Sequence, residues 1–105
     1  MKLENKVAVV TGGARDIGKA VSLQLAAEGA KVVINYYGSA EQAEQTLSEI
    51  TSAGGQAIAV KGDMTSQADV DNLLAETTKA FGDKIDILVN VAGGLVARKT
   101  LGEMD

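Results

Sequence analysis

Short apolar runs rich in β-branched residues alternate along this chain with segments of helical periodicity. The runs occupy 6–11 (KVAVVT), 31–37 (KVVINYY), 56–62 (QAIAVKG) and 84–90 (KIDILVN). Such alternation is typical of βαβ units built around a buried parallel sheet. Four strands joined by right-handed crossovers predict an α/β fold, a partial doubly wound (Rossmann) parallel sheet with strand order 3-2-1-4.

Three helices are expected between these strands. The first spans about 16–28 and stops at Gly29, the second follows an N-cap at Ser39, and the third follows an N-cap at Ser66 and stops at Gly82. Their apolar faces are predicted to comprise Ile17, Ala20, Val21, Leu23, Leu25 and Ala27, then Ala40, Ala43, Leu47 and Ile50, then Val70, Leu73, Leu74, Thr77 and Phe81.

The chain has 105 residues, which suffices for one core and is too short for two ordinary domains. After Gly94 we expect a helix that begins at about Thr100, which leaves strand 84–90 as an apolar edge with no neighbour. Folded proteins normally avoid such an edge. Residues 1–105 are therefore expected to be the N-terminal part of one longer domain.

Composition excludes several functions. The net charge is −4, and the ten Lys and Arg residues are scattered, which argues against a nucleic-acid or anionic-membrane surface. The chain has no cysteine and no histidine, so it cannot by itself supply a Cys/His zinc site or a histidine-dependent triad. The apolar run at 7–10 is too short for a signal sequence or membrane span, so a soluble, cytoplasmic protein is expected.

The stretch TGGARDIGKA, 11–20, joins the first strand to the first helix. Gly12 and Gly13 permit a sharp turn and close approach of a ligand to the backbone, and the helix N-terminus favours a pyrophosphate. The alternative to a phosphate-binding loop is a β-to-α turn in which the glycines serve backbone geometry alone. The carboxylate of Asp16 would cost roughly 3 kcal/mol about 6 Å from a pyrophosphate at an effective dielectric near 20. We therefore expect Asp16 to turn outward, capping the helix or pairing with Arg15 or Lys19.

Three motifs resemble those of the short-chain dehydrogenase/reductase family. Thr11-Gly12-x-x-x-Asp16-Ile17-Gly18 is similar to the family's Thr-Gly-x-x-x-Gly-Ile-Gly loop, with Asp16 in place of a glycine. Asn90-Val91-Ala92-Gly93 resembles its Asn-Asn-Ala-Gly element, and Asp63-Met64 resembles its acidic-plus-apolar pair. The glycine loop and the LVN-x-AG stretch are most similar to those of the 3-oxoacyl-(acyl carrier protein) reductases and their sugar- or polyol-oxidising relatives.

The resemblance implies a nicotinamide cofactor and residues that contact it. Asp63 would accept from the adenine amino group, the Met64 amide would reach a ring nitrogen, and Asn90 would contact the nicotinamide-side ribose. The alternative for both Asp63 and Asn90 is a purely structural role, in which each only stabilises a turn and contacts no ligand. The full expected set is Gly12, Gly13, Ala14, Arg15, Asp16, Ile17, Tyr37, Ser39, Asp63, Met64, Asn90, Ala92 and Gly93.

NADP is expected rather than NAD. An NAD-preferring fold usually carries an acid at the end of its second strand, and no carboxylate stands between Asn35 and Ser39. Arg15 precedes the second glycine position, where a basic residue in the family accompanies NADP, and Ser39 with the Gly38 amide could meet the 2′-phosphate. The alternative is that Arg15 is a solvated surface residue.

No catalytic residue is expected within this chain. The family's base is the tyrosine of Tyr-x-x-x-Lys, but Tyr36 and Tyr37 are followed four residues on by Ala40 and Glu41. The resemblance places the family's serine, tyrosine and lysine beyond Asp105, in a longer homo-oligomeric enzyme, dimer or tetramer, acting on a small carbonyl or alcohol. The alternative is a non-enzymatic nucleotide- or partner-binding protein; an unrelated Rossmann enzyme such as a methyltransferase is disfavoured.

Two acids near the fourth strand, Asp83 and Asp86, flank Lys84 at the end away from the expected crevice. Both are expected to be solvated.

Overall fold

The computed structural model describes residues 2–12, 16–38, 40–91 and 97–100. Its elements, in chain order, are β1 (Val7–Thr11), α1 (Asp16–Ala27), β2 (Lys31–Tyr36), α2 (Ala40–Ser52), β3 (Gln56–Lys61), α3 (Gln67–Phe81), β4 (Ile87–Asn90) and β5 (Ala97–Thr100).

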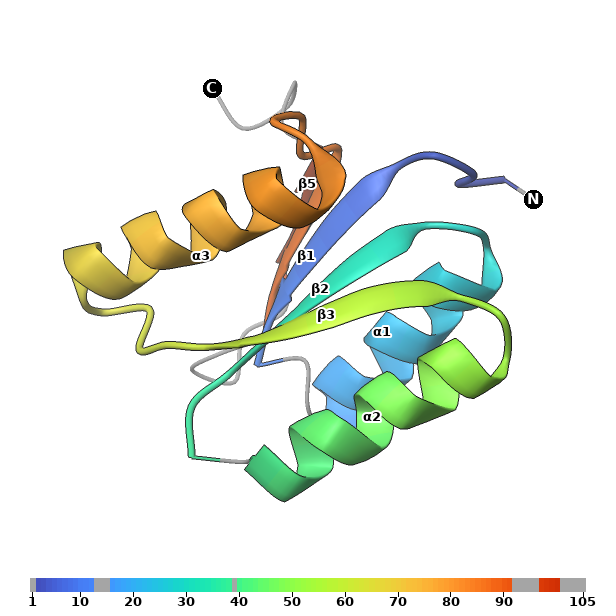
Figure 1. Ribbon diagram of the computed structural model, residues 1–105, viewed down its shortest axis with the longest axis horizontal. Helices are drawn as coiled ribbons and strands as arrows, with labels where there is room; N and C mark the ends of the chain where they lie inside the picture. The colour runs from blue at the N-terminus through green and yellow to red at the C-terminus, as the bar shows by residue number, and fades with distance from the viewer. Residues whose placement is uncertain (1, 13–15, 39, 92–96, 101–105) are drawn as a thin grey trace.

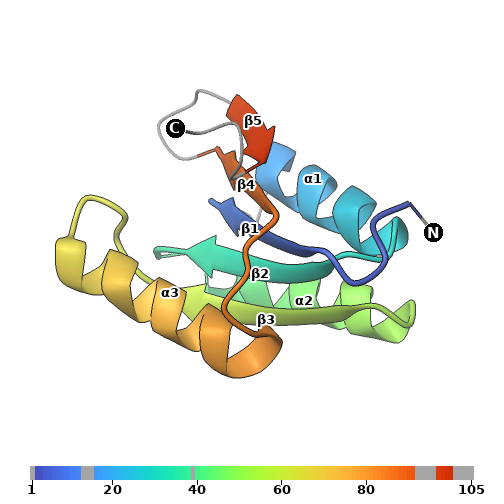
Figure 2. The same cartoon turned by 90° about the horizontal axis from the view of Figure 1, so that it is seen from above.

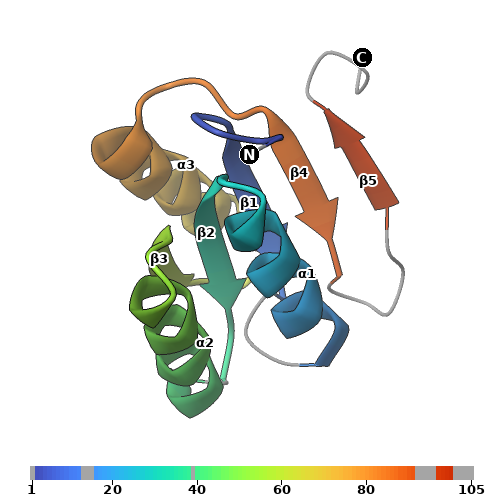
Figure 3. The ribbon, with the colours of Figure 1, turned by 90° about the vertical axis from the view of Figure 1, so that its right-hand side faces the viewer.

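The strands form one sheet in the order β3-β2-β1-β4-β5. β1 pairs in parallel with β2 and β4, and β2 pairs in parallel with β3, which confirms the predicted order 3-2-1-4. Helices α1 and α2 cover one face of the sheet and α3 covers the other, as Figures 1 and 3 show. Seen from above, the two helical layers lie on opposite sides of the strands (Figure 2).

The expectation of an unpaired fourth strand is wrong. β5 pairs antiparallel with β4, with Ile87 opposite Thr100 and Asn90 opposite Ala97. Thr100 therefore ends a strand. The physical reason is that an edge strand exposes a row of unpaired backbone N–H and C=O groups, and pairing with β5 satisfies the groups of β4. Residues 101–105, where the expected helix would continue, lie outside the described residues.

Alternate residues of the central strands fill two cores. Ala8, Val10 and Ile34 belong to the cluster beneath α1 and α2, whereas Val9 and Val33 belong to the cluster beneath α3. All five are at most 1% exposed. Because side chains alternate across a strand, burial on both faces requires the continuous apolar runs that the sequence displays.

The predicted helix faces need correction in detail. Ile17 is 56% exposed and Leu74 45% exposed, while the residues of α1 buried against the sheet are Gly18 and Ser22. Ser22 is buried because its hydroxyl donates to the Gly18 carbonyl at 2.8 Å, which satisfies a polar group that a hydropathy pattern assigns to solvent.

The ends of α3 are confirmed. Ser66 is the N-cap and its hydroxyl accepts from the Asp69 amide, while the Gly82 N–H donates to the Thr78 carbonyl at 2.9 Å. Gly82 has a φ of 95°, a left-handed conformation that glycine adopts without steric cost. The N-cap of α2 expected at Ser39 lies outside the described residues.

The expectation that Asp86 is solvated is wrong. Its side chain is 12% exposed and its Oδ2 accepts from the Val7 amide at 2.9 Å, which completes the pairing at the start of β1. Partial burial alone would raise the pKa of Asp86, but the Val7 amide and the Lys84 ammonium, 3.4 Å away, outweigh it and hold the pKa below its ordinary value. Asp83 is exposed, as expected.

Candidate functional site

The carboxyl ends of the parallel strands meet at one edge of the sheet. Thr11, the last residue of β1, stands opposite Asn35 of β2 and opposite Asn90, the last residue of β4. In an open α/β sheet the ligand crevice lies outside these ends, at the point where strand order reverses. That point lies here between β1 and β4. From β1 the chain adds β2 and β3 on one side of the sheet, and it then returns to place β4 on the other side of β1.

A hydrogen bond joins the two strands at the switch point. The Thr11 hydroxyl donates to the Asn90 side-chain oxygen at 2.8 Å, and the Val91 amide donates to the Thr11 carbonyl at 3.1 Å. Thr11 is buried, whereas Asn90 is exposed. Asn90 therefore has a structural partner and still presents part of its side chain to solvent at the crevice.

The glycine turn leads from this edge into α1. Gly12 has a φ of 70°, which a residue with a Cβ adopts only at a cost. Asp16 is the first residue of α1, is solvent-exposed and also has a positive φ, 53°. Asp is one of the few non-glycine residues enriched in this conformation, which explains how it occupies a position where a glycine would be unstrained.

Lys19 has an acidic partner on the neighbouring helix. Its ammonium lies 2.7 Å from Oε2 of Glu49 on α2. That ion pair joins α1 to α2 at a partly exposed position, so its contribution to stability is small.

The end of β2 carries no carboxylate. Asn35 is 3% exposed, and the residues that follow β2, Tyr37 and Gly38, are exposed. Tyr37 is 68% exposed, a large aromatic surface beside the crevice edge. The side chains available here to a ribose are consequently neutral.

Asp63 follows β3 in a structured turn. Its Oδ1 accepts from the Thr65 hydroxyl at 2.7 Å and from the Thr65 amide at 2.9 Å. The hydrogen bond from the Thr65 hydroxyl has the larger effect and that from the Thr65 amide the smaller. Together they hold the pKa of Asp63 below its ordinary value, so the carboxylate is ionised at neutral pH. Met64 packs against the core beneath α3.

Two residues at this edge were missed by sequence reasoning. The side-chain amide of Asn35 donates to the carbonyls of Val60 at 3.3 Å and Gly62 at 3.1 Å, and Oδ2 of Asp69 accepts from the Asp63 amide at 2.8 Å. An asparagine inside an otherwise apolar strand was the available signal for the first. For Asp69 the available signal was its place three residues after the N-cap Ser66, where an acid is typical of a helix start.

Of the predicted site residues, the structure describes Gly12, Asp16, Ile17, Tyr37, Asp63, Met64 and Asn90, all close to the carboxyl edge. The other six, Gly13, Ala14, Arg15, Ser39, Ala92 and Gly93, lie outside the described residues.

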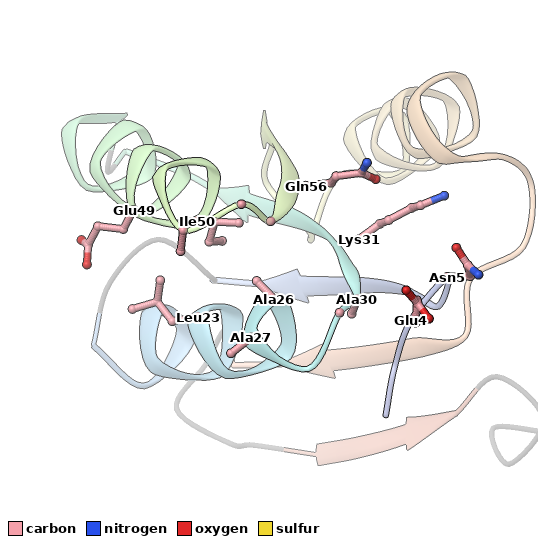
Figure 4. Close-up of a pocket in the computed structure, with 14 residues that line it drawn as sticks. Glu4, Asn5, Leu23, Ala26, Ala27, Ala30, Lys31, Glu49, Ile50 and Gln56 are labelled. Atoms are coloured by element: carbon pink, nitrogen blue, oxygen red, sulfur yellow. The ribbon is translucent and has the colours of Figure 1, made fainter. Parts of the chain in front are cut away.

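A cavity of about 640 Å³ lies at the opposite, amino edge of the sheet, between α1 and α2 (Figure 4). Leu23, Ile50, Lys31 and Glu49 are among its lining residues. The carboxyl ends of α1 and α2 border it, and these helix ends carry partial negative charge. A diphosphate would therefore be repelled there.

The described residues hold no cluster of acids that could bind a metal ion. Within the same residues, no helix is both long and apolar enough to cross a membrane.

Comparison with known proteins places this geometry in a family. The sequence matches the family described as short chain dehydrogenase over residues 6–105. It is 45% identical over 92 residues to the short-chain dehydrogenase/reductase homolog YusS of Bacillus subtilis, covering 88% of this chain and 84% of that protein.

Solved structures agree. A short-chain dehydrogenase/reductase from Serratia marcescens superposes with a TM-score of 0.84 and 42% identity, over 89% of this chain and 38% of that one. A short chain dehydrogenase from Burkholderia cenocepacia in complex with NADP superposes with a TM-score of 0.83 and 40% identity, over all of this chain and 42% of that one. The chain thus spans about two fifths of the solved structures it matches, and it belongs to the short-chain dehydrogenase family.

Proposed function

We propose that this chain forms the cofactor-binding part of an NADP-dependent oxidoreductase that transfers hydride between NADPH and a carbonyl or alcohol. The observation that carries the proposal is the carboxyl edge of β1, where Gly12 has a φ of 70° and the first two residues of α1, Asp16 and Ile17, are exposed. Unpaired N–H groups and partial positive charge at a helix N-terminus suit a diphosphate. The described residues therefore fit the group.

Each site residue has a proposed task. Backbone amides of Gly12, Gly13, Ala14 and Arg15 would hold the diphosphate, with Ile17 beneath it, and Ala92 and Gly93 would allow close passage of the cofactor. Ile17 and Tyr37 support this placement, because both expose large apolar surfaces near one edge of the sheet. Such surfaces become favourable when a ligand covers them.

Asp63 and Asn90 would bind opposite halves of the nucleotide. Asp63 would accept from the adenine amino group, and Asn90 would donate to the nicotinamide-side ribose. When bound, the nicotinamide supplies the hydride chemistry. The chain's own contribution is to bind and orient the nucleotide, since no tyrosine followed four residues later by lysine is present in its 105 residues.

Preference for NADP is proposed from charge. The end of β2 offers no carboxylate to repel a 2′-phosphate, and we assign Arg15 and Ser39 to that phosphate. The NADP complex of the Burkholderia relative supports this choice. A hydrogen bond between charged groups contributes about 1.5 to 3 kcal/mol, so Arg15→Ala should weaken NADPH roughly ten- to hundredfold and leave NADH nearly unchanged.

Calorimetric titration of both nucleotides tests this preference. Lys79→Ala removes one positive charge from the last turn of α3, away from the carboxyl edge, and serves as the control. Equal affinities for NADPH and NADH that ignore Arg15→Ala would refute the assignment.

For the protein as a whole we propose a cytoplasmic homodimer or homotetramer whose substrate is a small carbonyl or alcohol, with 3-oxoacyl thioesters as the first class to assay. NADPH consumption with acetoacetyl thioesters and simple sugars checks the substrate class.

A second candidate is a nucleotide-binding protein without catalysis. NADPH binding without consumption would support it.

A further inference from the structure

Two side chains from different elements hold one peptide bond at the carboxyl edge. The Asn35 side chain, from β2, donates to the Gly62 carbonyl at 3.1 Å. Oδ2 of Asp69, from α3, accepts from the Asp63 amide at 2.8 Å. That carbonyl and that N–H belong to the same peptide unit, Gly62–Asp63. Because a peptide unit is planar, fixing both of its polar groups fixes the direction in which the chain leaves β3.

Side chains from β2, α3 and the following turn surround Gly62 closely, so a side chain at this position would be crowded. A Cβ built on Gly62 would lie 3.3 Å from the Asp69 Cβ, 3.3 Å from the Met64 Cε and 3.7 Å from the Asn35 amide nitrogen. Asn35 is 3% exposed and has the same strand parity as Val33, which packs beneath α3. A buried amide in that position must keep its acceptors.

Asn35 and Asp69 together form what we call the clamp on the Gly62–Asp63 peptide. The side chain of Asp63 follows this peptide directly. Thr65 occupies Oδ1 of Asp63 with two hydrogen bonds, and the described residues give Oδ2 no partner. The orientation of the Asp63 carboxylate is thus set by the clamp behind it and by the turn ahead of it.

We propose that Asn35 and Asp69 are positioning residues for the adenine end of the cofactor, an inference that rests on the proposed function. They touch no nucleotide themselves. They hold the Gly62–Asp63 peptide so that Asp63 and the Met64 amide meet the adenine ring. The nicotinamide end would lie at Asn90, on β4, with β2 and β1 between it and β3. Loss of the clamp should therefore impair one end of the nucleotide selectively.

The test uses the full chain with Asp69→Ala, the conservative Asp69→Asn, and Asp71→Ala as the matched control. Asp71 lies two residues along α3, is exposed, and accepts only from Gln67 at 2.8 Å among the described residues. Affinity for 2′,5′-ADP should fall about tenfold or more in Asp69→Ala, since a charged hydrogen bond is lost, and recover largely in Asp69→Asn, which keeps an acceptor. Asp71→Ala should bind like the unmodified chain.

Amide spectra separate positioning from general damage. Without nucleotide, hydrogen exchange at the Asp63 amide should accelerate in Asp69→Ala and stay unchanged in Asp71→Ala. With saturating NADPH, the Val91 amide should still shift in Asp69→Ala, while the shift at Met64 should shrink. Asn35→Ala should produce the same pattern, and Asp69→Ala remains informative if that variant fails to fold.

The outcomes are distinct. If the unmodified chain binds NADPH and Asp69→Ala binds 2′,5′-ADP equally well, or if Asp69→Asn restores nothing, the positioning role is overturned while the proposed function stands. If the unmodified chain binds neither nucleotide, the proposed function fails and the inference fails with it.

Discussion

Asp16 has a strained backbone conformation at the start of α1. Its φ of 53° is left-handed, a region where a non-glycine residue costs about 1–2 kcal/mol. Asp16→Gly and Asp16→Ala both remove the charge at the start of α1, so they differ mainly in backbone cost. We expect the glycine variant to be the more stable by about 1 kcal/mol in urea unfolding, the reverse of the usual order within a helix. A more stable alanine variant would contradict the left-handed assignment.

The carboxylate of Asp16 should affect cofactor affinity little. Asp16 is solvent-exposed, so its repulsion of the diphosphate is screened. Asp16→Gly should then change the NADPH dissociation constant by less than about threefold, a fraction of a kcal/mol. A tenfold gain in affinity would show instead that the carboxylate opposes the diphosphate.

Asp86 predicts a pH dependence of stability. Its carboxylate accepts from the Val7 amide, and its pKa is below the ordinary value in the folded chain. Because the folded pKa is depressed, the stabilisation is full above the unfolded pKa of about 3.9 and is lost as the pH falls through the folded value. Asp86→Ala should cost about 1.5 to 3 kcal/mol at pH 7.

Urea unfolding between pH 7 and pH 3 measures this difference. The gap between the unmodified chain and Asp86→Ala should stay constant down to about pH 5 and narrow below about pH 4. Asp83→Ala, which alters an exposed acid three residues away, should show little difference at any pH. A gap that does not change with pH would mean that the Asp86 charge contributes nothing.

At the scale of elements, the N-cap of α3 supports the turn that holds Asp63. The Ser66 hydroxyl accepts from the Asp69 amide, one of the donors at the helix start that lack intrahelical partners. Ser66→Ala should lower the free energy of unfolding by about 1 kcal/mol. Ser48→Ala, in the exposed middle of α2, should be neutral or slightly stabilising in the same thermal unfolding experiment.

Periodicity predicted the elements but not how deeply each residue is buried. The four parallel strands and three helices follow from apolar runs and glycine stops, and the structure confirms them. Ile17 and Leu74 were assigned to the predicted stripes yet are exposed, although their neighbours Gly18 and Leu73 are buried, because a stripe does not fix which of two adjacent residues faces the sheet. Asp86 was missed because its partner, Val7, is 79 residues away in sequence.

The site was predictable only where its chemistry is local. Gly12 and Asp63 were found from turn and motif patterns. Asn35 and Asp69 were not, because their roles depend on three elements meeting at one peptide. β5 was likewise unpredicted, since a charged four-residue run carries little strand signal until an open edge is beside it.

At the scale of the whole molecule, the two edges of the sheet have opposite electrostatic character. The carboxyl edge receives the amino end of α1, whereas the amino edge receives the carboxyl ends of α1 and α2 and contains the 640 Å³ cavity. An anionic nucleotide should therefore bind at the carboxyl edge and not in the cavity at the amino edge.

The claim that the nucleotide binds at the carboxyl edge is tested most directly by titrating the isotopically labelled full chain with NADPH and recording amide spectra. The account predicts that the perturbed amides gather at the carboxyl edge, at Gly12, Tyr37, Met64 and Val91, while those of Lys31 and Gly54 beside the cavity stay in place. Perturbations gathered around Lys31 and Gly54, or none at all at saturating NADPH, would contradict it.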